Sequence, residues 1–255
     1  MQFRGDHLRS NARERTVIAA FSYNFTILSF PCVRDPTVTG TSVVAIKYKD
    51  GVMMVADTLG SYGSLARYKN LRRLHRIGES TLLGASGEYS DLQYILTTLD
   101  GLMTEEYVTA DGASMGAKEI YSYLGRVMSG RRSKMDPLWN YLVVGGFKDG
   151  SSFLGVVDLV GTQYTDNFVA TGYGNHLAIP LLRKNWRADM SEAEAKALLE
   201  TCMRVLYYRD ARTINKMQVA TVTAEGVSVG EPYSLSTEWE YASFVRKANL
   251  ADGSW

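Results

Sequence analysis

Thr41 and the glycine before it are the first residues in this sequence whose types suggest chemistry. A threonine preceded by glycine at the head of a strand can become an N-terminal nucleophile. Its hydroxyl then attacks while its own freed α-amine serves as the base. This requires cleavage of the Gly40–Thr41 peptide bond, because an amide nitrogen is not a base. Asp57, at the end of the next apolar segment, is the acidic residue that could accompany it. Gly-Thr pairs are common, so the pair alone is a weak indication of a peptidase.

Other familiar catalytic and cofactor-binding patterns are missing from the chain. Its three histidines are His7, His75 and His176, and no Gly-x-Ser-x-Gly nucleophile motif is present. Segment 84–87, Gly-Ala-Ser-Gly, comes nearest, and we expect it to be a close-packed strand end. There is no Walker loop, Gly-x-Gly-x-x-Gly or His-Glu-x-x-His. Two cysteines exclude a disulfide framework and a four-cysteine zinc site, and we expect no cofactor and no metal.

Composition and charge limit the classes of protein to which the chain can belong. Of its 255 residues 45% are apolar and 22% charged, which suffices for a sizeable core and excludes a disordered chain. Lys and Arg total 28 against 27 Asp and Glu, so the basic excess of nucleic-acid-binding proteins is lacking. We therefore expect no nucleic-acid partner, and we assign the basic runs 72–76 and 131–134 to a solvated surface or a subunit contact. No run of 18 apolar residues exists, so we expect no membrane partner.

Two β-hairpins are predicted from their turn residues. Thr41–Tyr48 is rich in β-formers, ends at an Asp-Gly turn and is followed by a second strand, Val52–Asp57. The same turn joins Tyr141–Phe147 to Ser152–Asp158. Asp-Gly favours tight hairpins because both residues tolerate positive φ. All four strands are apolar on both faces, which is typical of sheets covered on each side.

Four helices are predicted from apolar residues at helical spacing. They span about residues 92–103, 120–128, 175–185 and 191–206. Ser90 is the expected N-cap of the first helix. Pro180 is tolerated in the third only near its first turn. The fourth opens with a capping box, Ser191-x-x-Glu194.

The order of these elements predicts an α+β fold. With closing strands at about 217–223 and 227–229, the chain has two hairpin-built sheets and paired helices. Such elements pack as a four-layer αββα sandwich, with two sheets face to face and helices outside. No linker divides residues 41–233, which we assign to one domain, followed by a tail over 234–255 for inter-subunit contacts.

Residues 1–40 differ from the rest of the chain and are interpreted as a leader, a propeptide or an N-terminal arm. The segment is rich in arginine at its start, and polar residues interrupt the apolar run that follows. It lacks the clean apolar run and small-residue cleavage site of a signal peptide. An arginine-rich mitochondrial presequence is the alternative.

Several long motifs resemble β subunits of the eukaryotic 20S proteasome, and among these the subunits at the seventh ring position. The matching segments are 39–44, 51–52, 56–57, 59–67, 84–87, 131–140, 170–174 and 203–212. The resemblance extends over about residues 37–212. It implies the N-terminal-nucleophile hydrolase type of αββα sandwich, in agreement with the element order.

The resemblance implies that the family's active site falls on partly altered positions. These are Thr41, Asp57, Arg73, Gly87, Tyr173, Asp210 and Thr213. Arg73 stands where active subunits carry lysine. Arginine keeps its proton, with a pKa above about 12, so it cannot replace lysine in proton transfer. We therefore expect no catalytic residue in this chain.

The remaining positions of that site are interpreted as follows. The ring of Tyr173 stands in place of a small hydroxyl and is expected to crowd the site. Gly87, whose backbone N–H would be the oxyanion donor, is retained. Asp210 is also retained, and we expect it to hold Arg209, Arg212 or Arg73.

The resemblance also implies processing a few residues upstream of Thr41, which leaves the Gly40–Thr41 bond intact. The expected cleavage point lies near Cys32 and Val33, although the family usually has threonine at the new terminus. A retained leader would indicate a precursor, an assembly state or a lineage-specific arm.

The prediction is a non-catalytic structural subunit of the 20S proteasome, acting in ATP- and ubiquitin-dependent protein degradation in cytoplasm and nucleus. Its implied partners are β subunits at the first and sixth positions, α-ring subunits and the opposing β ring. The candidate contact residues are Arg131, Arg132, Lys134, Tyr208, Arg209, Arg212, Trp239, Phe244 and Trp255.

Two alternatives remain. An active threonine-type endopeptidase would carry a free Thr41 amine. An unrelated binding module that uses the basic runs, with nucleic acid as an example, would show salt-sensitive binding.

Overall fold

The computed structural model describes residues 37–109 and 114–240. Both predicted hairpins are confirmed. β2 (Val43–Tyr48) pairs with β3 (Gly51–Asp57), and β8 (Asn140–Lys148) pairs with β9 (Ser151–Val157). In the second hairpin, the turn residues Asp149 and Gly150 have positive φ, as tight hairpin turns require.

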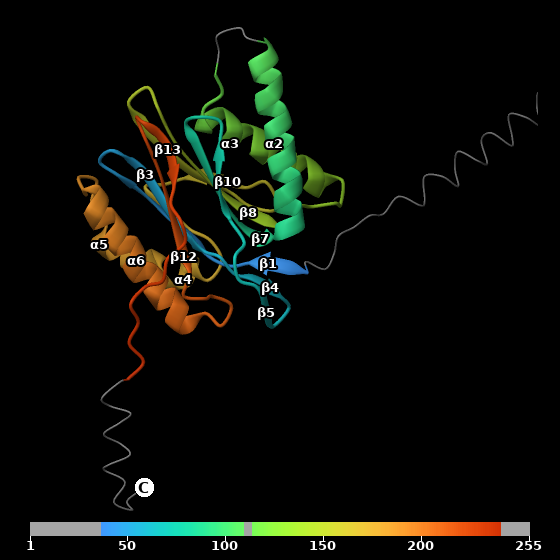
Figure 1. Cartoon of the computed structure of the whole chain (residues 1–255). Coiled ribbons are helices and arrows are strands. Elements are labelled where there is room, and N and C mark those ends of the chain that lie inside the picture. Colours follow the sequence, from blue (N-terminus) through green and yellow to red (C-terminus); the bar gives the residue numbers. More distant parts are fainter. Residues whose placement is uncertain (1–36, 110–113, 241–255) are drawn as a thin grey trace, which may run out of the picture. The chain divides into compact units, whose positions relative to one another are not determined.

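The strands form two antiparallel sheets (Figure 1). The smaller sheet has five strands in the order β11 (Phe168–Ala170), β2, β3, β12 (Met217–Thr223) and β13 (Gly226–Val229). The larger sheet has the order β10 (Gln163–Thr165), β9, β8, β7 (Thr81–Glu88), β1 (Val38–Gly40), β4 (Gly60–Tyr62) and β5 (Leu65–Tyr68). An eighth strand, β6 (Leu74–Ile77), also pairs with β7.

Helices cover the outer face of each sheet, which confirms the predicted four-layer sandwich (Figure 1). α2 (Tyr89–Thr109) and α3 (Ala117–Ser133) pack on the larger sheet, where they enclose one apolar core. α4 (Gly174–Leu177), α5 (Ile179–Asn185) and α6 (Glu192–Arg209) pack on the smaller sheet over a second core. A third core fills the space between the sheets.

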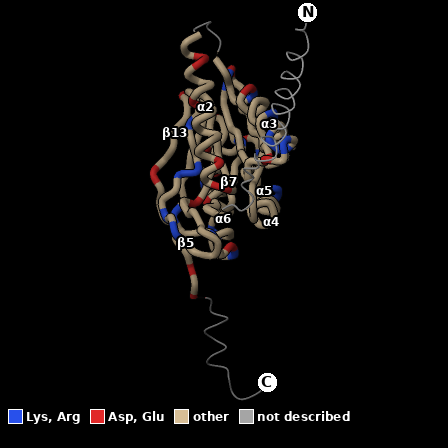
Figure 2. The backbone as a smooth tube through the Cα atoms, turned by 90° about the vertical axis from the view of Figure 1, so that its right-hand side faces the viewer, with Lys and Arg blue, Asp and Glu red and all other residues tan. Residues whose placement is uncertain are grey.

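In Figure 2, charged residues are marked at turns and along the outer helices. None of the described helices is both long and apolar enough to span a bilayer.

Two details of the predicted helices are wrong. The third helix is divided at Ala178, so that Pro180 lies at the start of the separate helix α5, where its missing N–H costs no hydrogen bond. Ser90 is not an N-cap, because α2 already begins at Tyr89 and the Ser90 hydroxyl donates to Glu88 Oε1 over 3.1 Å. The capping box of α6 is confirmed: the Ser191 N–H donates to Glu194 Oε2 at 2.9 Å.

Several short strands of the larger sheet have no counterpart in the sequence prediction. Segment 84–87 lies in β7 and is closely packed, as expected, because a Cβ on Gly84 would come within 2.9 Å of Val43 on the other sheet.

Strand β1 is one of the short strands that the sequence does not predict; it is three residues long and lies directly before Thr41. Strands this short are specified by their neighbours more than by their own residues.

Cys202 lies on α6 in the core of the smaller sheet and is fully buried. Burial raises the pKa of its thiol to about 12. The thiolate is the reactive form of cysteine. In a Cys32→Ser variant, we therefore expect Cys202 to resist a disulfide reagent at about pH 8 in the native protein and to react fully in denaturant. Fast labelling of the native protein would contradict this expectation.

Candidate functional site

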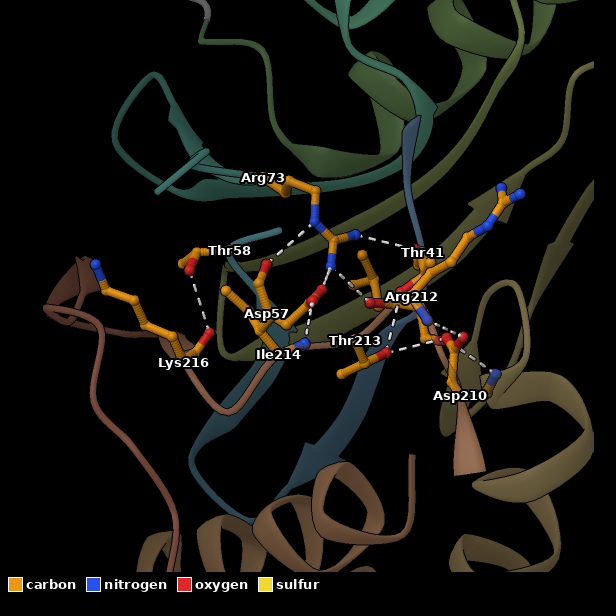
Figure 3. Close-up of polar contacts among 12 residues, drawn as sticks. Thr41, Asp57, Thr58, Arg73, Asp210, Arg212, Thr213, Ile214 and Lys216 are labelled. Atoms are coloured by element: carbon orange, nitrogen blue, oxygen red, sulfur yellow. Dashed lines mark hydrogen bonds and ion pairs between the residues drawn. The ribbon is translucent and has the colours of Figure 1, made fainter. Parts of the chain in front are cut away.

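Arg73 is the centre of a buried polar cluster between the two sheets (Figure 3). It lies just before β6 and is only 2% exposed. Its Nε donates to the Asp57 carbonyl at 3.1 Å; its Nη1 donates to the carbonyls of Thr41 and Ala85 at 2.9 and 3.2 Å. Its Nη2 donates to the Ser42 carbonyl at 3.0 Å and to Asp57 Oδ1. A guanidinium has five N–H groups, and all five are used inside the protein.

Asp57 ends β3 and is the buried counter-ion of Arg73. Its Oδ1 accepts from Arg73, and its Oδ2 accepts the Ile214 N–H at 3.3 Å. Burial raises the pKa of the Asp57 carboxyl, whereas the charge of Arg73 and the N–H of Ile214 act in the opposite direction. Because both carboxylate oxygens have partners and the residue is 1% exposed, Asp57 is arranged to hold Arg73.

The residues before Thr41 are part of the larger sheet. Thr39 is opposite Ser61 of β4 and Gly40 is opposite Gly87 of β7, so β1 has a hydrogen-bonded strand on each side. The buried Glu88 carboxylate accepts the N–H of Val38, with 3.1 Å to its Oε2. Strand β1 is therefore held at both edges and at its first residue.

Gly40 is required by the packing of Arg73. A Cβ on Gly40 would overlap the Cδ of Arg73 and lie 3.0 Å from its Nε. This packing is separate from the interpretation of Gly40 as a processing residue, which stays a prediction. A side chain at position 40 would displace the arginine from its five acceptors.

Thr41 is partly buried and contacts the turn after α6. Its Oγ1 lies 3.4 Å from Thr213 Oγ1, and the Thr213 hydroxyl donates to Asp210 Oδ2 at 3.0 Å. Asp210 Oδ1 accepts the backbone N–H of Arg212 at 2.9 Å. Asp210 therefore shapes this turn through a backbone N–H and a hydroxyl, rather than through an arginine side chain as the sequence suggests (Figure 3).

Gly87 and Tyr173 border the cluster in different ways. Gly87 has φ +98°, and a Cβ there would overlap the Trp139 carbonyl oxygen on the approach to β8. Tyr173 precedes α4 and is 58% exposed, so it lies outside the buried cluster that its ring is expected to crowd. Its neighbour Gly174 contacts the cluster by donating its N–H to Ser42 Oγ at 2.9 Å.

The predicted contact residues that the structure describes lie at the surface. Arg132, Lys134, Arg209, Arg212 and Trp239 are exposed, whereas Arg131 and Tyr208 are partly buried. The Trp239 ring packs edge-on against Tyr208, with centroids 5.1 Å apart. The residues Cys32, Val33, Phe244 and Trp255 lie outside the described residues.

Three residues of the cluster escape prediction from the sequence. Ser42 and Ala85 take part through backbone carbonyls, which carry no residue-type signal. Glu88 is a charged residue that is 2% exposed at the end of a strand, and only the tertiary structure shows that it binds Val38. Over residues 37–109 and 114–240, no three His, Cys, Asp or Glu side chains gather as metal ligands would.

Comparisons with known proteins agree over the described body of the chain. The family model described as "Proteasome subunit" matches residues 37–222. A protein of Arabidopsis thaliana named "Proteasome subunit beta type-4" is 57% identical over 220 residues, which cover 86% of this chain and 89% of that protein. The Xenopus laevis protein of the same name is 49% identical, with 83% and 88% covered. In Saccharomyces cerevisiae, a protein named "Proteasome subunit beta type-7" is 39% identical, with 84% and 85% covered.

Proposed function

Because this chain belongs to the proteasome subunit family, we propose that it is a β subunit that builds the proteolytic chamber without catalysing peptide hydrolysis. It assembles with other proteasome subunits as part of a protease complex. The observation that carries the non-catalytic role is the complete use of the Arg73 N–H groups inside the fold. An arginine held in this way neither moves a proton nor offers an N–H to a substrate.

The same hydrogen bonds give Arg73 a structural task. Its acceptors come from the junction of β1 and β2, from the end of β3 and from β7. These elements belong to different sheets, so one side chain fixes the point where the sheets meet. Charge-assisted hydrogen bonds are the stronger kind, and they are strongest where water is excluded.

While strand β1 remains part of the chain, it lies where a substrate would have to bind. The strand ends at Gly40, and Thr41 follows it directly. β1 lies between β4 and β7 and pairs with both strands. This pairing uses the backbone N–H and C=O groups with which β4 and β7 face β1. An extended substrate peptide would need those same groups to pair beside Thr41.

The proposal includes specific partners and a location. We place the chain at the seventh position of the β ring, with neighbours at the first and sixth positions, an α ring on one side and the opposing β ring on the other. The particle would degrade proteins in an ATP- and ubiquitin-dependent manner in cytoplasm and nucleus. Support comes from the relatives' names and from the exposed contact residues described above.

A Thr41→Ala variant tests the non-catalytic role in the assembled particle. The structure predicts normal incorporation, because Arg73 binds the Thr41 carbonyl and the hydroxyl makes only the 3.4 Å contact to Thr213. We expect every fluorogenic-peptide hydrolysis rate of the purified particle to stay within about twofold of wild type. N-terminal sequencing of this chain from the wild-type particle is expected to begin upstream of Thr41.

The control is the equivalent threonine-to-alanine change in a catalytic β subunit of the same particle, which must abolish one activity. Loss of one activity in Thr41→Ala particles that contain the normal amount of this chain would identify Thr41 as a nucleophile. A chain that begins at Thr41 would point the same way, since its α-amine would then be available as the base.

A further inference from the structure

The hairpin formed by β4 and β5 carries a group of exposed apolar and aromatic side chains. Of the twelve large side chains of this kind that are exposed in residues 37–109 and 114–240, three lie on this hairpin: Tyr62, Leu65 and Tyr68, which are 48%, 60% and 40% exposed. All four residues of β5 are exposed. These side chains contribute little to the core of the chain, and exposed apolar residues that gather in one place indicate a contact surface.

Arg67 lies against two of these rings. Its guanidinium carbon is 5.6 Å from the centroid of the Tyr62 ring and 5.4 Å from that of the Tyr68 ring, which is the range of cation–π contacts. The register of β5 against β4 passes from Ala66 to Tyr68 without pairing Arg67, which is therefore the extra residue of a β-bulge. Neighbouring residues of a regular strand point to opposite faces, whereas a bulge re-aims a side chain. The bulge thus allows Arg67 to contact both tyrosines.

The charge of Arg67 is not compensated within the part of the chain that the structure describes. Over residues 37–109 and 114–240, its guanidinium has neither a hydrogen-bond acceptor nor a carboxylate partner. Residues 58–76 contain five Lys and Arg and no Asp or Glu. Two of these arginines pair with acidic side chains elsewhere in the fold, whereas Arg67 and Lys69 stay exposed on the hairpin. Basic positions are marked beside β5 in Figure 2.

The base of the hairpin is fixed to the rest of the fold. The hydroxyl of the buried Thr58 donates to the Lys69 carbonyl at 3.1 Å, and the Leu71 N–H donates to the Thr58 carbonyl at 2.9 Å. Strand β4 also pairs with β1. The backbone that carries Arg67 is therefore supported from both strands, which lowers the entropy cost of binding a partner.

Protection of a sheet edge does not account for these features. β5 is the last strand of the larger sheet, and edge strands are commonly protected by charges and bulges (Figure 1). Such protection keeps apolar surface away from the edge, whereas this hairpin exposes Leu65 and two tyrosines. Tyrosine and arginine are enriched among the residues that supply most of the binding energy of protein interfaces. The hairpin therefore has the composition of an interface.

We propose that the β4–β5 hairpin docks an acidic segment of a neighbouring subunit of the particle, with a carboxylate of that segment paired to Arg67. The carboxylate follows from the uncompensated charge of Arg67 and from its planar fork, which binds a carboxylate through two N–H groups. Leu65 and the tyrosines contact the apolar part of the same segment and exclude water from the ion pair. This assignment rests on the proposed function, because it takes the partner to be another subunit of the same assembly.

The first test is competition between an Arg67→Glu chain and the wild-type chain, expressed together at equal levels. We expect the ratio of variant to wild type in purified particles to fall roughly tenfold or more, since a carboxylate would then face a carboxylate. Arg67→Lys should lose less, because it keeps the charge and lacks only the planar fork.

Arg126→Glu is the matched control, because it makes the same change of charge at an exposed position of α3. It should be incorporated as well as wild type. Both full-length glutamate variants should unfold close to the wild-type urea midpoint, because exposed cation–π contacts add little to stability. Equal incorporation of Arg67→Glu and wild type would overturn the docking assignment while leaving the proposed function intact. Absence of the wild-type chain from particles would instead overturn the proposed function.

A photo-crosslinking residue identifies the partner segment. In purified particles, a Leu65→benzoylphenylalanine chain should crosslink to a neighbouring subunit, at a residue that adjoins an Asp or Glu. Reversing that acidic residue to arginine in the neighbour should restore incorporation of the Arg67→Glu chain, because the ion pair is then rebuilt with the charges exchanged. Crosslinks that fall within this chain, or beside no acidic residue, would overturn the docking assignment.

Discussion

Replacing Arg73 with methionine is expected to destabilise the protein by about 3–5 kcal/mol, the cost of removing one partner of a buried ion pair. The change leaves Asp57 charged and without its counter-ion, at a position that is 1% exposed. It also removes the donors for the carbonyls of Thr41 and Ser42. Urea unfolding of the full-length chain measures the loss, and incorporation into particles should fall with it.

Two further variants show whether the network or the charge is responsible. Arg73→Lys keeps the charge, but the lysine ammonium has only three N–H groups, whereas the acceptors around Arg73 take five. We therefore expect an intermediate loss of stability, about 1–3 kcal/mol. Arg72→Met is the control, because the ion pair of Arg72 with Glu231 is exposed and should cost less than about 1 kcal/mol. If Arg73→Met were no more damaging than Arg72→Met, the five hydrogen bonds would not hold the sheets together.

Gly87→Ala is the second variant with a large expected effect. The new methyl group would overlap the Trp139 carbonyl oxygen and lie 3.1 Å from the Asn140 Cα. Both atoms belong to the backbone, so β7 and β8 would have to separate. The positive φ adds strain. We expect a loss of about 4 kcal/mol or more, seen as failure of the chain to fold or to enter particles.

Gly150→Ala separates the clash from the strain. Gly150 also has positive φ, +71°, but a Cβ there would meet nothing within 4 Å. Its cost should be the left-handed penalty alone, about 1–2 kcal/mol. Equal effects of the two variants would show that the approach to β8 does not constrain position 87. A folded Gly87→Ala chain that entered particles normally and altered a peptidase rate would favour the oxyanion role over the packing role.

Elements with strong local signals could be predicted from the sequence. The Asp-Gly turns specify two hairpins, and Ser191 with Glu194 specifies the start of α6, because each signal acts between residues close in the chain. Ser90 has the residue type of a cap but is already the second residue of α2, since the chain passes directly from β7 into the helix at Tyr89. The break at Ala178 depends on packing against the smaller sheet, which the pattern of residues 175–185 does not contain.

The candidate site, like the fold, could be predicted only in part from the sequence. The types and order of Thr41, Asp57 and Arg73, with the family resemblance, identify where the site lies and why an arginine cannot act as the lysine does. They do not predict that Asp210 binds a backbone N–H, or that Tyr173 stays exposed. Those outcomes depend on the exact path of two turns far apart in the chain.

By itself, the sequence determined the αββα layers, because periodicity and turn chemistry are local properties that repeat along the chain. The family followed from the resemblance of several motifs to a known family. Only the tertiary structure decided what Arg73 does. Its acceptors lie 12 to 32 residues away, and most are carbonyls that every residue possesses. Which carbonyls meet a buried guanidinium depends on the register of β1 against β4 and β7, and register is set by packing across the whole sheet.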